Sequence, residues 1–503
     1  MESLAQALGS IQASLARWLV ILNDTYIATD RISAFSDLAC AGDSMAGIQS
    51  TKRRGFLNAT LSAGGAGLSL ASLLQMRANG SDNEAAAGQD TAVIQIWLGG
   101  GPSQFETFDP KPDAPVEFRG PYAPISTRLP SVLACEKLPL TAQVLDRTAI
   151  IRTVTHSTNG HFVGAHWLSS GYPGTSNRTS HPSSGSITSF LRGPVTPGMP
   201  AYVLLSEEQT RNPEIGSVMS ASYLGSGHEP FTLLQDPFRN SYQEEKVQSA
   251  TSSLQLADAL TLDRLDDRRL LLKHLDHLSR ESDEKAMRGA DEFGQLALRM
   301  VTSGRARKAF DLSAEPDAVR RRYGFHRWGQ MGLLARRLVE AGVTFVTFNL
   351  APDSLCWDWH LNIVNDNRPA DGSAGPSRGM DISGPPLDQM LSALITDIYD
   401  RGLDKRVLLL VWGEFGRTPR VNKTGGRDHW GRLMSILMAG GGLKVGQVIG
   451  ESTPKGEEPA SRPVAPTDIL ATMYRHLGIS PESQTITNAG RPIPLLPNGR
   501  PVQ

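Results

Sequence analysis

Short apolar runs separated by longer segments with a helical period are the dominant pattern from about residue 90 onward. Apolar runs with few polar interruptions are typical of strands that are buried on both faces of a sheet. The longer segments repeat leucines every three or four residues among charges, which is typical of amphipathic helices. The expected strands are 92–98, 147–154, 201–205, 343–350, 406–412 and 434–442, and the expected helices are 253–303, 329–342, 385–402 and 466–478.

The alternation of helices and apolar strands predicts an α/β fold: a doubly wound, mostly parallel sheet with helices on both faces. No internal repeat interrupts the pattern, so we expect one domain over residues 91–503. Ligands of such sheets bind beyond the carboxyl ends of the strands. Polar groups gather at four such ends, after residues 98, 154, 350 and 412, which predicts a site there.

The segment before this domain has the pattern of an export signal. "TKRRGFLN" at 51–58 is followed by a small, glycine-rich apolar stretch up to residue 76, which resembles a twin-arginine signal. We therefore expect a signal and linker over 45–90 and a periplasmic or secreted protein. A basic turn before a buried helix is the alternative. Residues 1–44 are expected to be a spurious leader or a disordered extension, with Met45 as the true start.

Charge and cysteine content narrow the function classes. The formal net charge is −1 over 503 residues, so no overall field attracts the protein to nucleic acid. The three cysteines, Cys40, Cys135 and Cys356, are widely spaced and form no CxxC pair, which argues against a zinc–thiolate site and a disulfide framework.

Carboxylates and imidazoles follow two of the expected strands. Asp358 and His360 come after strand 343–350, and Glu414 and His429 come after strand 406–412. These are ligand types that zinc, manganese or iron binds. Each has a structural alternative: Asp358 could cap a turn, Glu414 could form an ion pair and His429 could be a core histidine. Their gathering at one end of one sheet favours a metal site.

Other polar residues could complete the site. A second metal ion would need further ligands, for which Ser103, Glu106 and Asp109 are available after the first strand, and His156, His161 and His166 after the second. Arg417 and Arg427 could present planar donor groups to a phosphate or sulfate. Their alternative is a salt bridge to Glu414 or Asp428.

The motifs "WLGGGPSQFETFDPKP", "WDWHLN", "VLLLVWGEFGRTPRVN" and "GRDHWGRLMSILMAGGG" resemble the DUF1501 family, which belongs to the alkaline phosphatase and sulfatase-like superfamily. The resemblance covers nearly all of residues 92–500. It implies that Asp358 and His360 form one metal pair with His429, and that Glu414 occupies the position of a later carboxylate. Asp109, Ser103 or Glu106 would replace an early aspartate, and His161 occupies the nucleophile position.

The expected function is metal-dependent hydrolysis of phosphate or sulfate esters in the cell envelope. Zinc or manganese would occupy one or two sites, with His161, Arg417 and Arg427 as catalytic residues and Asp109, Asp358, His360, Glu414 and His429 as ligands. The expected partners are a small-molecule or polysaccharide ester and, during export, the twin-arginine translocase. The alternative is a non-catalytic binding or structural protein on a degenerate sulfatase-like fold. A dinucleotide oxidoreductase is disfavoured because "GGGPSQ" lacks the GxGxxG spacing.

Overall fold

The computed structural model divides into two compact units, Met1–Gln75 and Met76–Gln503. It describes residues 90–174, 180–205, 217–232, 300, 304–350, 356–364, 379–487 and 489–503, which all belong to the second unit. The expected leader, export signal and linker, and nearly all of the expected helix 253–303, lie outside the described residues.

One seven-stranded sheet with the order β11–β4–β10–β7–β1–β6–β5 forms the centre of the second unit. Only β10 runs antiparallel to its neighbours in this sheet, and all other pairs are parallel. The expected mostly parallel sheet is therefore confirmed. Its strands are β1 (Ala92–Trp97), β4 (Thr148–Val154), β5 (Tyr202–Leu205), β6 (Phe345–Asn349), β7 (Val407–Trp412), β10 (Met434–Gly440) and β11 (Gln447–Ile449).

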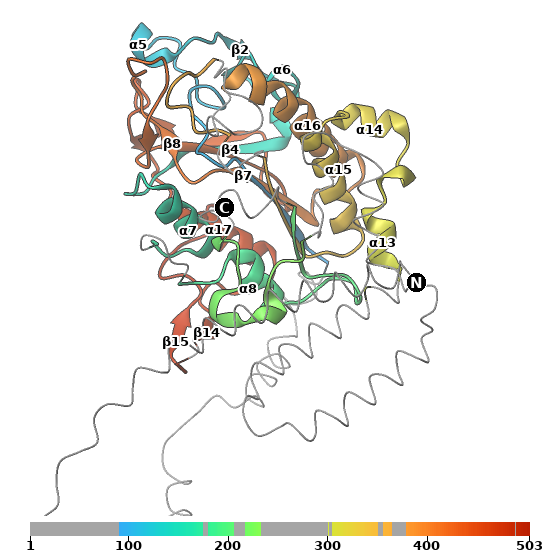
Figure 1. The fold of residues 1–503 in the computed structure, drawn as a ribbon. Coiled ribbons are helices and arrows are strands. Elements are labelled where there is room, and N and C mark those ends of the chain that lie inside the picture. Colours follow the sequence, from blue (N-terminus) through green and yellow to red (C-terminus); the bar gives the residue numbers. More distant parts are fainter. Residues whose placement is uncertain are drawn as a thin grey trace, which may run out of the picture. The chain divides into compact units, whose positions relative to one another are not determined.

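Helices cover both faces of this sheet (Figure 1). The first face carries α13 (Arg305–Phe310), α14 (Asp317–Tyr323), α15 (Arg327–Glu340) and α16 (Met380–Asp400), and the second carries α7 (His161–Ser170), α8 (Ser184–Leu191) and α17 (Pro466–His476). Successive side chains of a strand point to opposite faces. In β1, Ile94 and Ile96 join the first core while Val93 and Trp97 join the second. An apolar run without alternation is therefore what this position in the fold requires.

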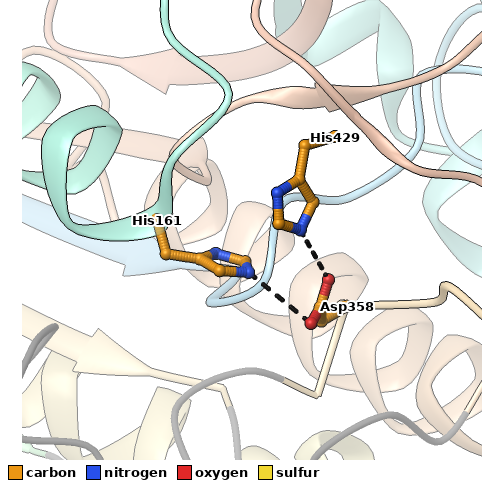
Figure 2. Close-up of side chains that lie close together, drawn as sticks. All are labelled: His161, Asp358 and His429. Atoms are coloured by element: carbon orange, nitrogen blue, oxygen red, sulfur yellow. Dashed lines mark hydrogen bonds and ion pairs between the residues drawn. The ribbon is translucent and has the colours of Figure 1, made fainter.

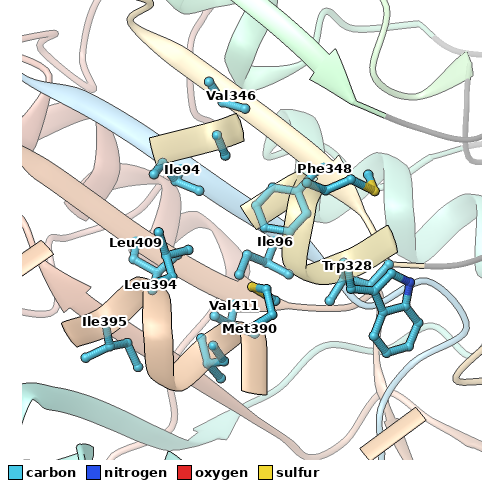
Figure 3. Close-up of a cluster of buried hydrophobic side chains, with 14 of the residues drawn as sticks. Ile94, Ile96, Trp328, Val346, Phe348, Met390, Leu394, Ile395, Leu409 and Val411 are labelled. Atoms are coloured by element: carbon cyan, nitrogen blue, oxygen red, sulfur yellow. The ribbon is translucent and has the colours of Figure 1, made fainter. Parts of the chain in front are cut away.

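The first core is formed by α15 and α16 against the middle strands (Figure 3). Helix α15 begins where the ring of His326 accepts a hydrogen bond from the backbone N–H of Gly329. The labelled side chains from the helices are Trp328, Met390, Leu394 and Ile395, and those from the strands are Ile94, Ile96, Val346, Phe348, Leu409 and Val411. All are fully or almost fully buried.

Smaller elements surround the sheet. The short strands are β2 (Pro124–Ser126), β3 (Leu133–Cys135), β8 (Gly416–Arg417), β9 (His429–Trp430), β12 (Glu451–Ser452), β13 (Pro459–Ser461), β14 (Gln484–Ile486) and β15 (Pro492–Pro494). The short helices are α5 (Val116–Arg119) and α6 (Pro139–Ala142), with 3-10 turns at Leu145–Arg147, Ser222–Leu224, Ser226–His228 and Leu312–Ala314. Among the described residues, no helix has the length and apolar character needed to cross a membrane.

The strand directions define one edge that we call the carboxyl rim. It consists of the carboxyl ends of β1, β4, β6 and β7, which point the same way, and of the amino end of the antiparallel β10. The four polar segments expected to follow strand ends therefore leave the sheet at this rim.

Truncating a buried side chain of α16 tests how much the helix-to-sheet packing stabilises the fold. We expect Ile395→Ala to lower the free energy of unfolding by about 2–5 kcal/mol, because the cavity left in a close-packed core collapses only partly. Ile382→Ala is the matched control, since Ile382 lies on the same helix but is 40% exposed while Ile395 is 0% exposed. The control should cost no more than about 0.5 kcal/mol. Equal denaturant midpoints for the two variants would contradict the packing.

Candidate functional site

Four segments bring polar side chains together at the carboxyl rim. His161 is the first residue of α7, which follows β4, and Asp358 and His360 lie in the segment that follows β6. Glu414 comes two residues after the end of β7. His429 begins the short strand β9 ahead of β10. The rings of His161 and His429 point from different elements toward the carboxylate of Asp358 (Figure 2).

His161, Asp358 and His429 form the central group. One ligand atom from each lies within 4.8 Å of the other two, as a shared metal ion requires. His429 Nε2 is 3.0 Å from Asp358 Oδ1, and His161 Nε2 is 3.5 Å from Asp358 Oδ2. His161 Nε2 is buried and makes no hydrogen bond.

His360 lies beside this group and adds a third imidazole. Its Nε2 is 3.0 Å from Asp358 Oδ1 and 2.8 Å from His429 Nε2. The side chain of His360 is 36% exposed, compared with 15% for His161. It therefore occupies the solvent side of the cluster.

The second nitrogen of each ring, Nδ1, makes a hydrogen bond with an oxygen on the side of the ring opposite Asp358. His161 Nδ1 lies 2.6 Å from Glu414 Oε1, and His360 Nδ1 lies 2.8 Å from Asp428 Oδ1. His429 Nδ1 donates to the backbone carbonyl of Asn159 at 2.7 Å. Carbonyls and carboxylates only accept hydrogen bonds, so each Nδ1 carries a proton. Each Nε2 faces Asp358, where a charged ring donates a proton to the carboxylate and a neutral ring would offer its lone pair to a cation.

Electrostatics in the group are dominated by the partly buried Asp358 carboxylate. Burial alone would raise the pKa of Asp358, but its contacts with the three histidines and the charge of Arg417 hold that pKa well below its usual range. Burial likewise opposes a charge on His161, yet its neighbours Asp358 and Glu414 outweigh it and raise the pKa of His161 to about 9. Burial lowers the pKa of His429, helped by Arg417 and His161. The group therefore attracts positive charge.

Glu414 supports the cluster from behind His161. Its side chain is fully buried, and Oε1 accepts hydrogen bonds from His161 Nδ1 and from the backbone N–H of Gly100 at 2.8 Å. Its second oxygen, Oε2, has no partner. A carboxylate on the far nitrogen of a metal-binding histidine fixes both the ring and its tautomer. In this arrangement Glu414 orients His161.

Arg417 is fully buried and supports Asp358. Its guanidinium lies 2.5 Å from Asp358 Oδ1 and donates to the carbonyls of Gly100, Gly101 and Arg427. These contacts use most of its five N–H donors. The guanidinium therefore orients the carboxylate and offers little to a substrate.

The structure does not bring Asp109 and Arg427 into the cluster. Asp109 is buried between Lys111 and Arg152, at 3.0 and 3.3 Å, and accepts a hydrogen bond from Ser452. Arg427 pairs with the buried Glu106 at 2.9 Å. A buried charge needs a partner of opposite sign, and both residues find one away from Asp358.

The histidines and the serine that were left open also have structural contacts. His156 Nε2 lies 2.8 Å from the carbonyl of Glu414, and burial lowers the pKa of His156 to about 4. His166 lies 2.9 Å from the carbonyl of Tyr172. Ser103 accepts a hydrogen bond from the backbone N–H of Phe105.

Two supporting groups could not be found by sequence reasoning. They are the Asn159 carbonyl and the Gly100 N–H, and since nearly every residue carries a carbonyl and an N–H, no sequence signal marks them. Asp428, which binds His360 Nδ1, has a sequence signal, because it is a carboxylate that directly precedes the candidate ligand His429 in "GRDHW".

Comparison with solved structures gives only weak likenesses. A lipoteichoic acid synthase from Listeria monocytogenes is 8% identical with a TM-score of 0.34, over 78% of this chain and 73% of that one. A sulfatase from Pseudoalteromonas sp. is 12% identical with a TM-score of 0.34, over 81% and 70%. A phosphonate monoester hydrolase from Silicibacter pomeroyi is 11% identical with a TM-score of 0.32, over 82% and 75%. Scores this low support no functional conclusion.

Sequence comparison is more informative about the family. No curated protein sequence matches the chain. Residues 90–503 match the family described as "Protein of unknown function (DUF1501)". Since this match spans most of the chain, the protein belongs to the DUF1501 family.

Proposed function

We propose that the protein is a metal-dependent hydrolase of phosphate or sulfate esters that acts after export to the cell envelope. One observation carries the metal site: the Nε2 atoms of His161, His360 and His429 all face the Asp358 carboxylate, while each Nδ1 is held from behind. Three imidazole nitrogens and one carboxylate oxygen match the ligand types and number that zinc prefers, and manganese or iron also takes them.

The short distance between His360 and His429 shows that the two rings share a positive charge. Their Nε2 atoms are only 2.8 Å apart, and each ring already uses its proton on Nδ1. Two lone pairs that face each other at this distance repel unless a positive charge lies between them. In the metal-free protein a second proton on His360, whose pKa is raised by Asp358, supplies that charge, and a metal ion beside Asp358 would replace it.

The proposed ligands are His161, Asp358 and His429, with His360 as the fourth. A divalent ion held there would polarise an ester oxygen and lower the pKa of a water molecule to about 7. Glu414 keeps His161 Nε2 directed at the ion, and Arg417 keeps Asp358 in place. His360, on the solvent side, is the ligand nearest to an incoming substrate. A small-molecule or polysaccharide ester is the proposed substrate.

A metal-binding protein without turnover is the second candidate. The buried contacts of Arg417 favour it, because hydrolysis of a phosphate or sulfate ester usually needs a free cationic group to stabilise the transition state. In the described residues, Arg427 is likewise engaged by Glu106. In this proposal Arg417 and Arg427 do not contact the substrate. They contribute to the site only by holding Asp358 and Glu106 in place.

Metal titration tests the site itself. We expect the folded protein to bind zinc or manganese, and His429→Ala to weaken binding by more than about 100-fold, since losing an outer-shell partner alone costs 10- to 100-fold. His228→Ala is the matched control because His228 contacts Ser189 and Phe190 of α8. Elemental analysis and calorimetric titration provide the readouts. A metal-free wild-type protein that fails to bind either ion would rule out the proposal.

Turnover separates the two candidate functions. Purified protein is assayed with aryl phosphates and aryl sulfates, with added zinc or manganese and after chelation. We expect metal-dependent hydrolysis, and a fall in kcat/KM of at least about 100-fold in Asp358→Asn, because the variant loses the charge on which the cluster converges. Stoichiometric metal without hydrolysis of either ester class would support the binding protein instead.

Export is tested separately because residues 45–89 lie outside the described residues. We propose that residues 51–76 direct twin-arginine export. Replacing both Arg53 and Arg54 by lysine should retain the unprocessed precursor in the cytoplasm, since this signal is read through its arginine pair. Cell fractionation with N-terminal sequencing measures the outcome, and normal processing of the double variant would contradict the proposal. A peptide from residues 1–44 in the precursor would contradict a start at Met45.

A further inference from the structure

A seven-residue loop is docked against the segment that carries Asp358 and His360. This loop, residues 422–428, is the second part of the connection 418–428 between β8 and β9, which pair through Gly416 with Trp430 and Arg417 with His429. We call it the clamp loop. Its last residue, Asp428, directly precedes His429 and binds the His360 ring. The clamp loop is thus joined to His429 through the chain and to His360 through a hydrogen bond.

The side chain of Asn422 makes hydrogen bonds both within the clamp loop and across to the segment that carries His360. Its Oδ1 accepts hydrogen bonds from the backbone N–H of Thr424 at 3.1 Å and of Gly426 at 2.9 Å. Its Nδ2 donates to the carbonyl of His360 at 2.8 Å. The partners fix which atom is oxygen and which is nitrogen, because N–H groups only donate and carbonyls only accept.

Further contacts tie the two segments together along their backbones. The N–H of Arg427 donates to the carbonyl of Trp359 at 2.8 Å, and the N–H of Ile363 donates to the carbonyl of Gly425 at 3.0 Å. The hydroxyl of Thr424 lies 3.0 Å from the His360 carbonyl, which Asn422 also binds. The backbone on both sides of His360 is therefore held by the clamp loop.

The fit leaves no room for a side chain at Gly426. A Cβ atom there would lie 2.1 Å from the carbonyl oxygen of His360 and 2.5 Å from that of Trp359. Both obstacles are backbone atoms, which cannot rotate away as a flexible side chain would. The approach of the two segments thus depends on glycine at this position.

We propose that Asn422 is a positioning residue of the metal site: through the His360 carbonyl it sets the placement of His360 and, two residues earlier in the same segment, of Asp358. The inference rests on the proposed metal site. Asn422 touches neither the proposed ion nor its ligand atoms, and acts only through the backbone that carries the ligands. Supporting groups of this kind change metal affinity by about 10- to 100-fold.

Two substitutions separate the docking from the fold of the loop. Asn422→Asp keeps one oxygen that accepts from the N–H groups of Thr424 and Gly426. The second carboxylate oxygen replaces the Nδ2 donor, so the hydrogen bond to the His360 carbonyl is lost. Gly426→Ala introduces no charge and forces the loop away from the same carbonyl. Asn498→Asp is the matched control, since Asn498 accepts a hydrogen bond from Thr467 through Oδ1, which aspartate retains.

The experiment uses the full chain with zinc alone as the probe, followed by hydrogen exchange of the metal-free protein. We expect both variants to bind zinc about 10- to 100-fold more weakly than the wild type and the control. We also expect faster exchange in peptides covering residues 356–364, because the N–H of Ile363 loses its acceptor on the clamp loop.

The two readouts distinguish the proposals. Unchanged zinc affinity and unchanged exchange in both variants would overturn the role of Asn422. A fall in thermal midpoint without a change in zinc affinity would show that the loop contributes only to the fold, and would also overturn it. If the wild type binds no zinc while exchange at 356–364 rises in the variants, the metal proposal fails and the positioning of the segment stands.

Discussion

The contact between the Asp358 carboxylate and the Arg417 guanidinium is the interaction on which the rest of the carboxyl rim depends. Both groups are largely removed from water, and a buried charge is tolerated only when it is paired and hydrogen-bonded. Arg417 finds its other acceptors in the carbonyls of Gly100 and Gly101. Gly100 and Gly101 have φ values of 111° and 84°, which residues with side chains rarely adopt. The glycine-rich turn after β1 thus presents two carbonyls to the arginine of β8.

The main features of the fold could be read from the sequence because each strand of a doubly covered sheet must be apolar on both sides. The runs that became β1, β4, β5, β6, β7 and β10 all meet this requirement. The direction of β10 could not be read in this way. An apolar run looks the same whether its strand runs parallel or antiparallel, and the direction is set by the connection and the neighbours.

The sequence placed Asp358, His360, Glu414 and His429 near one another because each of them follows or precedes a strand end at the same rim. It did not assign their individual contacts. Glu414 was expected to be a ligand, while the structure places its carboxylate on the far side of His161. Partners such as Glu106 and Arg427 are 321 positions apart in the chain. Ion-pair partners at such separations follow only from the three-dimensional fold, which is why Asp109 and Arg427 could not be separated from the cluster by sequence reasoning.

The reversed direction of β10 has a consequence for how this architecture can gather functional groups. In an all-parallel sheet the chain leaves every strand at the carboxyl rim and enters every strand at the opposite edge. Only the segment after each strand therefore reaches this rim. A reversed strand also exposes the segment that enters it, and His429 arrives by that route. β7 and β10 are adjacent and antiparallel, so the chain between them both leaves and re-enters the sheet at the same edge. The connection 413–433 therefore begins and ends at the same edge of the sheet, so a single excursion of the chain carries Glu414, Arg417 and His429 to the cluster without a crossover to the opposite edge.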